Sequence, residues 1–114
     1  MLRYAYNNAR SNYEYYGDGG GDFTLDLSSV ESIDGDVHLD SNGESYYNYY
    51  ADAYGGEVSV DLSSVTEIGG RIYAYENGYC YGYSSSYYCD GGSFTLTADA
   101  LTSVGGEVYL YRNG

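Results

Sequence analysis

Residues 56–78 read GEVSVDLSSVTEIGGRIYAYENG, and this stretch decides the fold because the chain repeats it on both sides. From Gly21 the chain reads GDFTLDLSSVESIDGDVHLDSNG, and from Gly92 it reads GSFTLTADALTSVGGEVYLYRNG. The three starts lie 35 and 36 residues apart. A fixed interval of this length is typical of repeat proteins, in which each repeat packs on its neighbours.

The first half of each repeat predicts a strand. In residues 58–62 apolar Val58, Val60 and Leu62 alternate with polar residues, which is the period-two pattern of a strand buried on one face. The other copies alternate in the same way over residues 23–27 and 94–98. A turn follows and carries two apolar residues in every copy, namely Val30 and Ile33, Val65 and Ile68, and Leu101 and Val104.

The second half of each repeat predicts another strand, followed by an asparagine. Ile72 and Ala74 point one way while Tyr73 and Tyr75 point the other, and residues 37–40 and 108–111 alternate likewise. The N-terminal YAYNN aligns with the same strand. We expect the asparagines to form a ladder, in which each side-chain amide bonds the backbone of its own and the next repeat. Its members are Asn8, Asn42, Asn77 and Asn113.

Like strands that recur at a fixed interval, far beyond the length of a hairpin turn, pair in parallel with their copies. The sequence therefore predicts an all-β fold: a parallel β-solenoid with ~35-residue coils, two short strands per coil, Tyr-rich loops and no significant helix. A single repeat domain spans residues 1–114, with a partial coil at 1–20 and coils at 21–55, 56–91 and 92–114.

The third copy, with ALTSVGGEVYLYRN, resembles the leucine-rich-repeat-like β-solenoid segments of bacterial and phage surface proteins, which are related in pattern to receptor L domains. The resemblance covers about 23 of every 35 residues. It implies two parallel sheets, a role as adhesin, receptor or structural fibre, and no catalytic residues. The chain departs from this pattern in the Tyr-rich segment of about 12 residues that follows each asparagine.

The charge and the hydropathy of the chain argue against nucleic acid and membrane as partners. Seventeen Asp and Glu residues against four Lys and Arg give a formal net charge of -13, which repels phosphate, so we expect no nucleic-acid binding. No apolar run reaches the ~18 residues of a membrane helix, so we expect no membrane insertion. The start, residues 1–4, lacks the apolar stretch of a signal peptide, so an exported chain would already have lost its leader.

The two cysteines, Cys80 and Cys89, lie in one Tyr/Ser/Gly segment without a His or carboxylate cluster beside them. We expect a local disulfide, which indicates an extracellular protein or one at the cell or virion surface. Two free thiols in a cytosolic protein are the alternative.

The sequence offers poor material for catalysis, so we expect no enzyme, no cofactor and no metal. His38 is the one histidine, and we expect it to be an exposed side chain beside Asp40. The acidic stretches 18–22 and 34–36 lack the ligand spacing of an EF-hand; solvated turns are the preferred interpretation, and adventitious Ca²⁺ is the alternative.

The chain has nineteen tyrosines, and its Tyr-rich segments use the residue palette of adaptable recognition surfaces. Neither end shows a polar capping coil, which favours either head-to-tail self-assembly into a filament or a piece of a longer array. Binding of a carbohydrate or protein ligand is the second hypothesis, and a merely solvated surface is the third. The candidate surface comprises Tyr4, Tyr6, Tyr46, Tyr47, Tyr49, Tyr50, Tyr73, Tyr75, Tyr81, Tyr83, Tyr87, Tyr88, Tyr109 and Tyr111.

Overall fold

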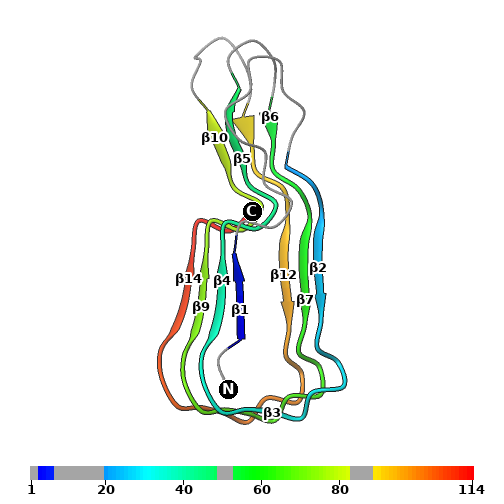
Figure 1. Ribbon diagram of the computed structural model, residues 1–114, viewed down its shortest axis with the longest axis vertical. Coiled ribbons are helices and arrows are strands. Elements are labelled where there is room, and N and C mark those ends of the chain that lie inside the picture. The colour runs from blue at the N-terminus through cyan, green and yellow to red at the C-terminus, as the bar shows by residue number, and fades with distance from the viewer. Residues whose placement is uncertain (1–2, 7–19, 49–52, 83–88) are drawn as a thin grey trace.

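The computed structural model describes residues 3–6, 20–48, 53–82 and 89–114, and every regular element in these ranges is a β-strand (Figure 1). No helix that could span a membrane occurs in this part of the chain. In chain order the strands are β1 (Arg3–Tyr6), β2 (Phe23–Asp26), β3 (Ser32–Ile33), β4 (Val37–Asp40), β5 (Ser45–Asn48), β6 (Ala53–Tyr54), β7 (Val58–Asp61), β8 (Glu67–Ile68), β9 (Ile72–Tyr75), β10 (Cys80–Gly82), β11 (Cys89–Asp90), β12 (Phe94–Thr97), β13 (Ser103–Val104) and β14 (Val108–Tyr111).

The strands form parallel sheets, which confirms the predicted all-β fold with parallel pairing. One sheet has the order β1-β4-β9-β14, a second β12-β7-β2 and a third β13-β8-β3. Each strand pairs with its own copy in the next repeat, so Val37 aligns with Ile72 and Ile72 with Val108. The first two sheets lie on opposite sides of the molecule, and the third closes one end between them (Figure 1).

Backbone hydrogen bonds join successive repeats. The N–H of Val37 donates to the carbonyl of Arg71 at 2.8 Å, and the N–H of Ile72 donates to the carbonyl of Glu107 at 2.9 Å. The corner before β7 depends on glycine, because a Cβ on Gly55 would overlap the carbonyl of Gly78. Only a residue without a side chain allows the backbones to approach this closely.

The core lies between the sheets and is most complete in the middle repeat. Val58, Val60 and Leu62 are fully buried, whereas Phe23 and Phe94, in the repeats on either side, are only partly buried. A repeat therefore needs a neighbour on both faces to bury its apolar column. The buried core comprises Ile33, Val37, Leu39, Val58, Val60, Leu62, Val65, Ile68, Ile72 and Ala74.

Two parts of the predicted architecture were wrong. A third short strand lies between the two predicted ones in each repeat, because burial of Ile33 and Ile68 fixes this turn against its copies and the N–H of Gly69 then donates to the carbonyl of Ile33 at 2.8 Å. The Tyr-rich segments predicted as loops also contain strands, since β10 pairs with β5 and β11 with β6. An extended backbone stacked on its own copy pairs with it whatever its side chains are.

Candidate assembly and binding surface

Four tyrosines form a grid on the outer face of the four-stranded sheet, and we call Tyr73, Tyr75, Tyr109 and Tyr111 the tyrosine ladder. The register of β9 and β14 aligns Tyr73 with Tyr109 and Tyr75 with Tyr111. The first pair of rings has centroids 5.0 Å apart and planes 11° apart, and the second has 5.6 Å and 9°. These values describe stacked aromatic pairs, which hold the grid together beyond simple burial.

The ladder continues into β4 with different residues. His38 aligns with Tyr73 and contacts it edge-on, with ring centroids 4.6 Å apart and an interplanar angle of 77°. Its side chain is partly buried in this contact, where the sequence predicted an exposed histidine. Asp40 aligns with Tyr75 in the neighbouring column. Beyond β4, the backbone of β1 aligns Tyr4 with His38.

The remaining predicted tyrosines differ in how much of them the structure describes. Tyr81 lies in β10 and is not a member of the ladder, and its ring contacts that of Tyr79 with centroids 5.2 Å apart. Sequence reasoning missed Tyr79 and also Tyr54, whose side chain is half exposed. For Tyr4, Tyr6, Tyr46 and Tyr47 the structure describes the backbone alone, in β1 and β5; Tyr49, Tyr50, Tyr83, Tyr87, Tyr88 and Asn8 lie outside the described residues.

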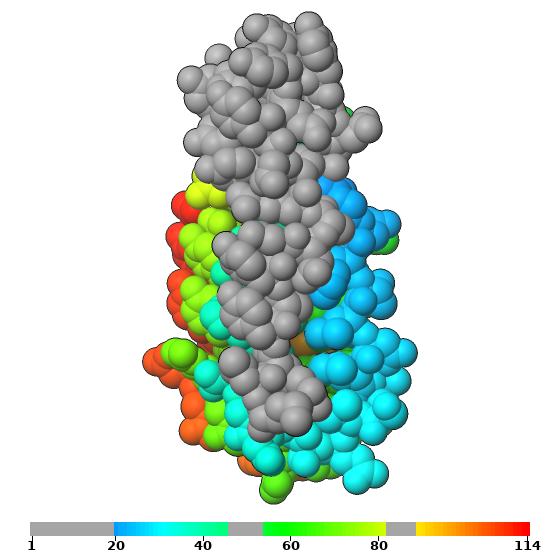
Figure 2. Space-filling view, viewed as in Figure 1, coloured from blue at the N-terminus to red at the C-terminus, as the bar shows by residue number. Residues whose placement is uncertain are grey.

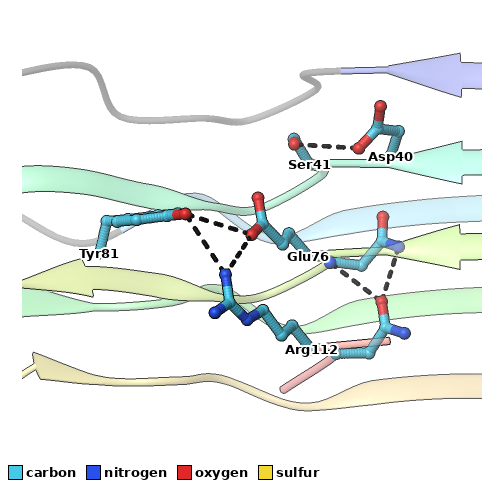
Figure 3. Close-up of polar contacts among 7 residues, drawn as sticks. Asp40, Ser41, Glu76, Tyr81 and Arg112 are labelled. Carbon is cyan, nitrogen blue, oxygen red and sulfur yellow. Dashed lines mark hydrogen bonds and ion pairs between the residues drawn. The ribbon is translucent and has the colours of Figure 1, made fainter. Parts of the chain in front are cut away.

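A buried carboxylate connects the main sheets to the Tyr-rich segments (Figure 3). The side chain of Glu76 is 7% exposed, and its Oε1 accepts from Nη1 of Arg112 at 3.2 Å and from the hydroxyl of Tyr81 at 3.4 Å. The guanidinium carbon of Arg112 also lies 5.2 Å from the ring centroid of Tyr111 and 5.5 Å from that of Tyr79, within cation–π range. One carboxylate thus ties together the second and third repeats and a Tyr-rich segment.

The same carboxylate changes the acidity of its neighbours. A hydrogen bond to Glu76 raises the pKa of Tyr75 to about 12, because losing the phenol proton would bring two negative charges together. Burial, followed by the charge of Glu76, raises the pKa of Tyr81. The hydrogen bond to Glu76 also raises the pKa of Arg112. These groups therefore keep their protons well above neutral pH.

Sequence reasoning missed this cluster, although the repeat carried a signal for it. Ser41, Glu76 and Arg112 occupy the same position, directly before the asparagine, and all three have a positive φ, at 55°, 55° and 52°. Residues at one repeat position stack in the fold, so opposite charges there in adjacent copies indicate an ion pair.

Three of the predicted ladder asparagines lie in one hydrogen-bonded column. Nδ2 of Asn42 donates to Oδ1 of Asn77 at 2.8 Å, and Nδ2 of Asn77 donates to Oδ1 of Asn113 at 2.8 Å. Asn77 Nδ2 also donates to the carbonyl of Leu39 at 3.1 Å, and Asn113 Nδ2 to that of Ala74 at 2.9 Å. The predicted backbone contacts are therefore joined by direct bonds between the side chains.

A disulfide joins Cys80 and Cys89, as the sequence predicted. It links β10 to β11 at the two ends of the Tyr-rich segment between them, where Cys80 aligns with Ser45 and Cys89 with Ala53. Within the residues that the structure describes, no group of three or more His, Cys, Asp or Glu side chains is placed to hold a metal ion.

The C-terminal edge of the four-stranded sheet is apolar and open. In Figure 2 the C-terminal residues, in red and orange, form the outermost layer on one side. Val108 is 57% exposed and Leu110 is 55% exposed, although both occupy the inward column of the repeat. Ile72 and Ala74, their partners in β9, are 3% and 0% exposed.

Comparison with protein-family models, with curated proteins and with solved structures finds no match to this chain.

Proposed function

We propose that this chain is a non-enzymatic, extracellular structural protein whose repeats are coils of a leucine-rich-repeat-like parallel β-solenoid and which assembles head to tail into a filament. The exposed apolar edge of β14 carries the proposal. An edge strand with free backbone groups and uncovered apolar side chains is a template for another strand. The disulfide between Cys80 and Cys89 supports an oxidising, extracellular setting.

The edge has the energetic features of an interface. Val108 and Leu110 expose more than half of their surface, and covering both would contribute roughly 2 to 3 kcal/mol at the usual value for an apolar side chain. Backbone hydrogen bonds along four residues of β14 would add to this. A surface of this kind is uncommon on a protein that stays monomeric.

The strand that would cover β14 is β1 of a second copy. β1 pairs with β4 in the same register that β9 makes with β14, so the two ends of the sheet are continuations of one pattern. In that register Leu110 would align with Ala5 of the next copy, and Tyr109 with Tyr4. The sheet of β2, β7 and β12 has no described strand at the level of β1, so the junction would rest on β14.

The experiment is negative-stain microscopy with light-scattering mass on the wild type, on Leu110→Asp and on Ser59→Asp as the matched control. Ser59 is exposed on the outer face of β7, so it receives the same charge far from the edge. We expect filaments for the wild type and the control and folded monomers for Leu110→Asp, which should fold because Leu110 is already exposed in a single chain.

Three results would overturn the filament. Filaments of unchanged length and yield from Leu110→Asp would show that β14 is not the junction. Monodisperse wild-type particles of 12.5 kDa would show that the chain does not assemble at all, and a closed dimer would replace the head-to-tail contact with a symmetric one.

The second candidate function is ligand binding, and the tyrosine ladder favours it. Stacked rings that stand on a flat sheet present phenol edges and hydroxyls, which suit a carbohydrate or a protein loop. If the wild type is monomeric, a glycan array and a Tyr73→Ala/Tyr109→Ala variant become the test. Loss of a specific signal in the variant would support this role.

A further inference from the structure

The tyrosine ladder holds phenols in fixed pairs. Tyr73 faces Tyr109 and Tyr75 faces Tyr111, each pair nearly parallel, at 5.0 and 5.6 Å between centroids. Within a strand the separations are longer, 6.3 Å for Tyr73 and Tyr75 and 5.9 Å for Tyr109 and Tyr111. The rings paired across the strands are thus closer and more nearly parallel than those within a strand, whose planes lie 26° and 27° apart.

We propose that the ladder is a site of oxidative cross-linking, at which Tyr73 couples to Tyr109 and Tyr75 to Tyr111 as dityrosine. The oxidant is a one-electron oxidant such as a peroxidase acting with hydrogen peroxide. Each phenol loses one electron and one proton and becomes a phenoxyl radical. The two radicals form a carbon–carbon bond between the ring positions ortho to the hydroxyls, and the hydrogens on these carbons move to the oxygens. Hydrogen peroxide takes up the two electrons and two protons and becomes water.

The surroundings of Tyr75 suit this chemistry because a phenol must give up its proton when it is oxidised. Glu76 follows Tyr75 in the chain, and its carboxylate raises the pKa of this phenol, so a proton acceptor lies beside Tyr75. That carboxylate is held in place by Arg112 at 3.2 Å. Glu76 is thus placed to accept the proton as the electron leaves.

The ladder is also accessible. Tyr109 and Tyr111 are 41% and 42% exposed at the open edge, so a small oxidant or a radical carrier reaches both rings. The rings stand on the outer face of the sheet, where solvent leaves room for the rotation that brings two ortho carbons together. Exposure alone would favour Tyr54 of β6, which is 51% exposed. If the register decides the coupling, the product joins the ladder pairs; if exposure alone decides it, Tyr54 is the tyrosine that reacts.

The experiment treats the folded chain, with its disulfide intact, with peroxidase and hydrogen peroxide at low protein concentration. After denaturation a Glu-specific protease releases peptides 68–76 and 108–114, which carry the two halves of the ladder. We expect a cross-linked product of these two peptides, lighter than their sum by two hydrogen atoms for each bond formed. Because the pairs are held together, its yield should be roughly tenfold or more above that of a chain oxidised in guanidinium.

Variants assign the bonds. Phenylalanine stacks like tyrosine but cannot form a phenoxyl radical, so Tyr109→Phe/Tyr111→Phe should remove the product and Tyr109→Phe alone should leave the bond between Tyr75 and Tyr111. Tyr54→Phe, the matched control, should leave the product unchanged. Equal yields from folded and unfolded chains, or absence of the product from the folded chain, would overturn the proposal.

The cross-link stands independently of the filament. The coupled pairs lie within one chain, so Leu110→Asp should give the same product even where it abolishes assembly. A mixture of isotopically heavy and light chains separates the two cases. In an equal mixture, coupling within a chain, as proposed, joins peptides 68–76 and 108–114 of the same label only, whereas random coupling between chains would make half of these products mixed and would contradict the proposal.

Discussion

The side-chain amide of Asn42 donates to the side-chain oxygen of Asn77 at 2.8 Å, across the boundary between two repeats. Asn77 is fully buried and continues the column by donating to Asn113. Its side chain therefore bonds to three repeats at once. A buried amide with this many partners is expensive to remove, because each partner left behind loses a hydrogen bond without gaining water.

We expect Asn77→Ala to lower the free energy of unfolding by about 2 to 4 kcal/mol, since it removes the buried hydrogen bonds that the Asn77 side chain makes with the Asn42 amide and the Leu39 carbonyl. Asn113→Ala is the control, because Asn113 is only partly buried and water can replace its contacts. Urea unfolding followed by circular dichroism measures both. Equal losses for the two variants would contradict a column anchored at its centre.

The second prediction concerns Tyr75. Its pKa is raised to about 12 in the folded chain against an ordinary 10, so the folded state holds the phenol proton more tightly than the unfolded state does. Stability should therefore be unaffected by this group below pH 10 and should fall as pH rises from about 10 through 12. Glu76→Gln removes the charge, and the pKa of Tyr75 should then move toward 10. NMR of ring-labelled tyrosine, assigned with Tyr75→Phe, follows the titration; an unmoved pKa in Glu76→Gln would reject the assigned cause.

Two ion pairs of similar geometry should differ in their effect on stability. Arg112 meets a carboxylate whose side chain is 7% exposed, whereas Arg71 meets Asp36 at 3.4 Å with side chains 56% and 34% exposed. We expect Arg112→Leu to lower the urea midpoint clearly, because it leaves Glu76 charged and buried, and Arg71→Leu to leave the midpoint nearly unchanged. A larger effect at Arg71 would show that burial of the carboxylate does not set the difference.

A second disulfide should form one repeat earlier. Ser45 aligns with Cys80 and Ala53 with Cys89, so the backbone of the Tyr-rich segment after Asn42 repeats the positions that the native disulfide joins. We expect Ser45→Cys/Ala53→Cys to oxidise without free thiols and to raise the free energy of unfolding by about 2.5 kcal/mol through loop closure. Thiol titration under denaturing conditions checks this, with Ser45→Cys alone as the control. Two titratable thiols in the double variant would mean that the backbones of the two segments do not superpose.

The sequence predicted the strands in which apolar and polar residues alternate. Val58, Val60 and Leu62 mark their strand because every second residue is apolar, and repetition at a fixed interval sets the pairing. The strand Ser45–Asn48 carries no such pattern, so its pairing with β10 had no signal in side chains. A strand of two residues, such as β3, is also too short to show the alternation of apolar and polar residues.

The candidate site was also predicted only in part. The tyrosines of β9 and β14 were found because they alternate with core residues, and the disulfide because its cysteines are close in sequence. The contact of Glu76 with Arg112 spans 36 residues and joins two charges that look solvated when read singly. It becomes visible only when the residue before each asparagine is compared across the repeats.

The asparagine column has a direction. Asn42 donates to Asn77 and Asn77 donates to Asn113, so both bonds between side-chain amides run from the N-terminal toward the C-terminal side of the stack. A row of amides aligned in this way adds its dipoles, as a chain of hydrogen bonds polarises its members. Any array built by continuing the row therefore has two chemically different ends. Subunits would then add to the two ends at different rates, and a labelled seed would grow faster at one end than at the other.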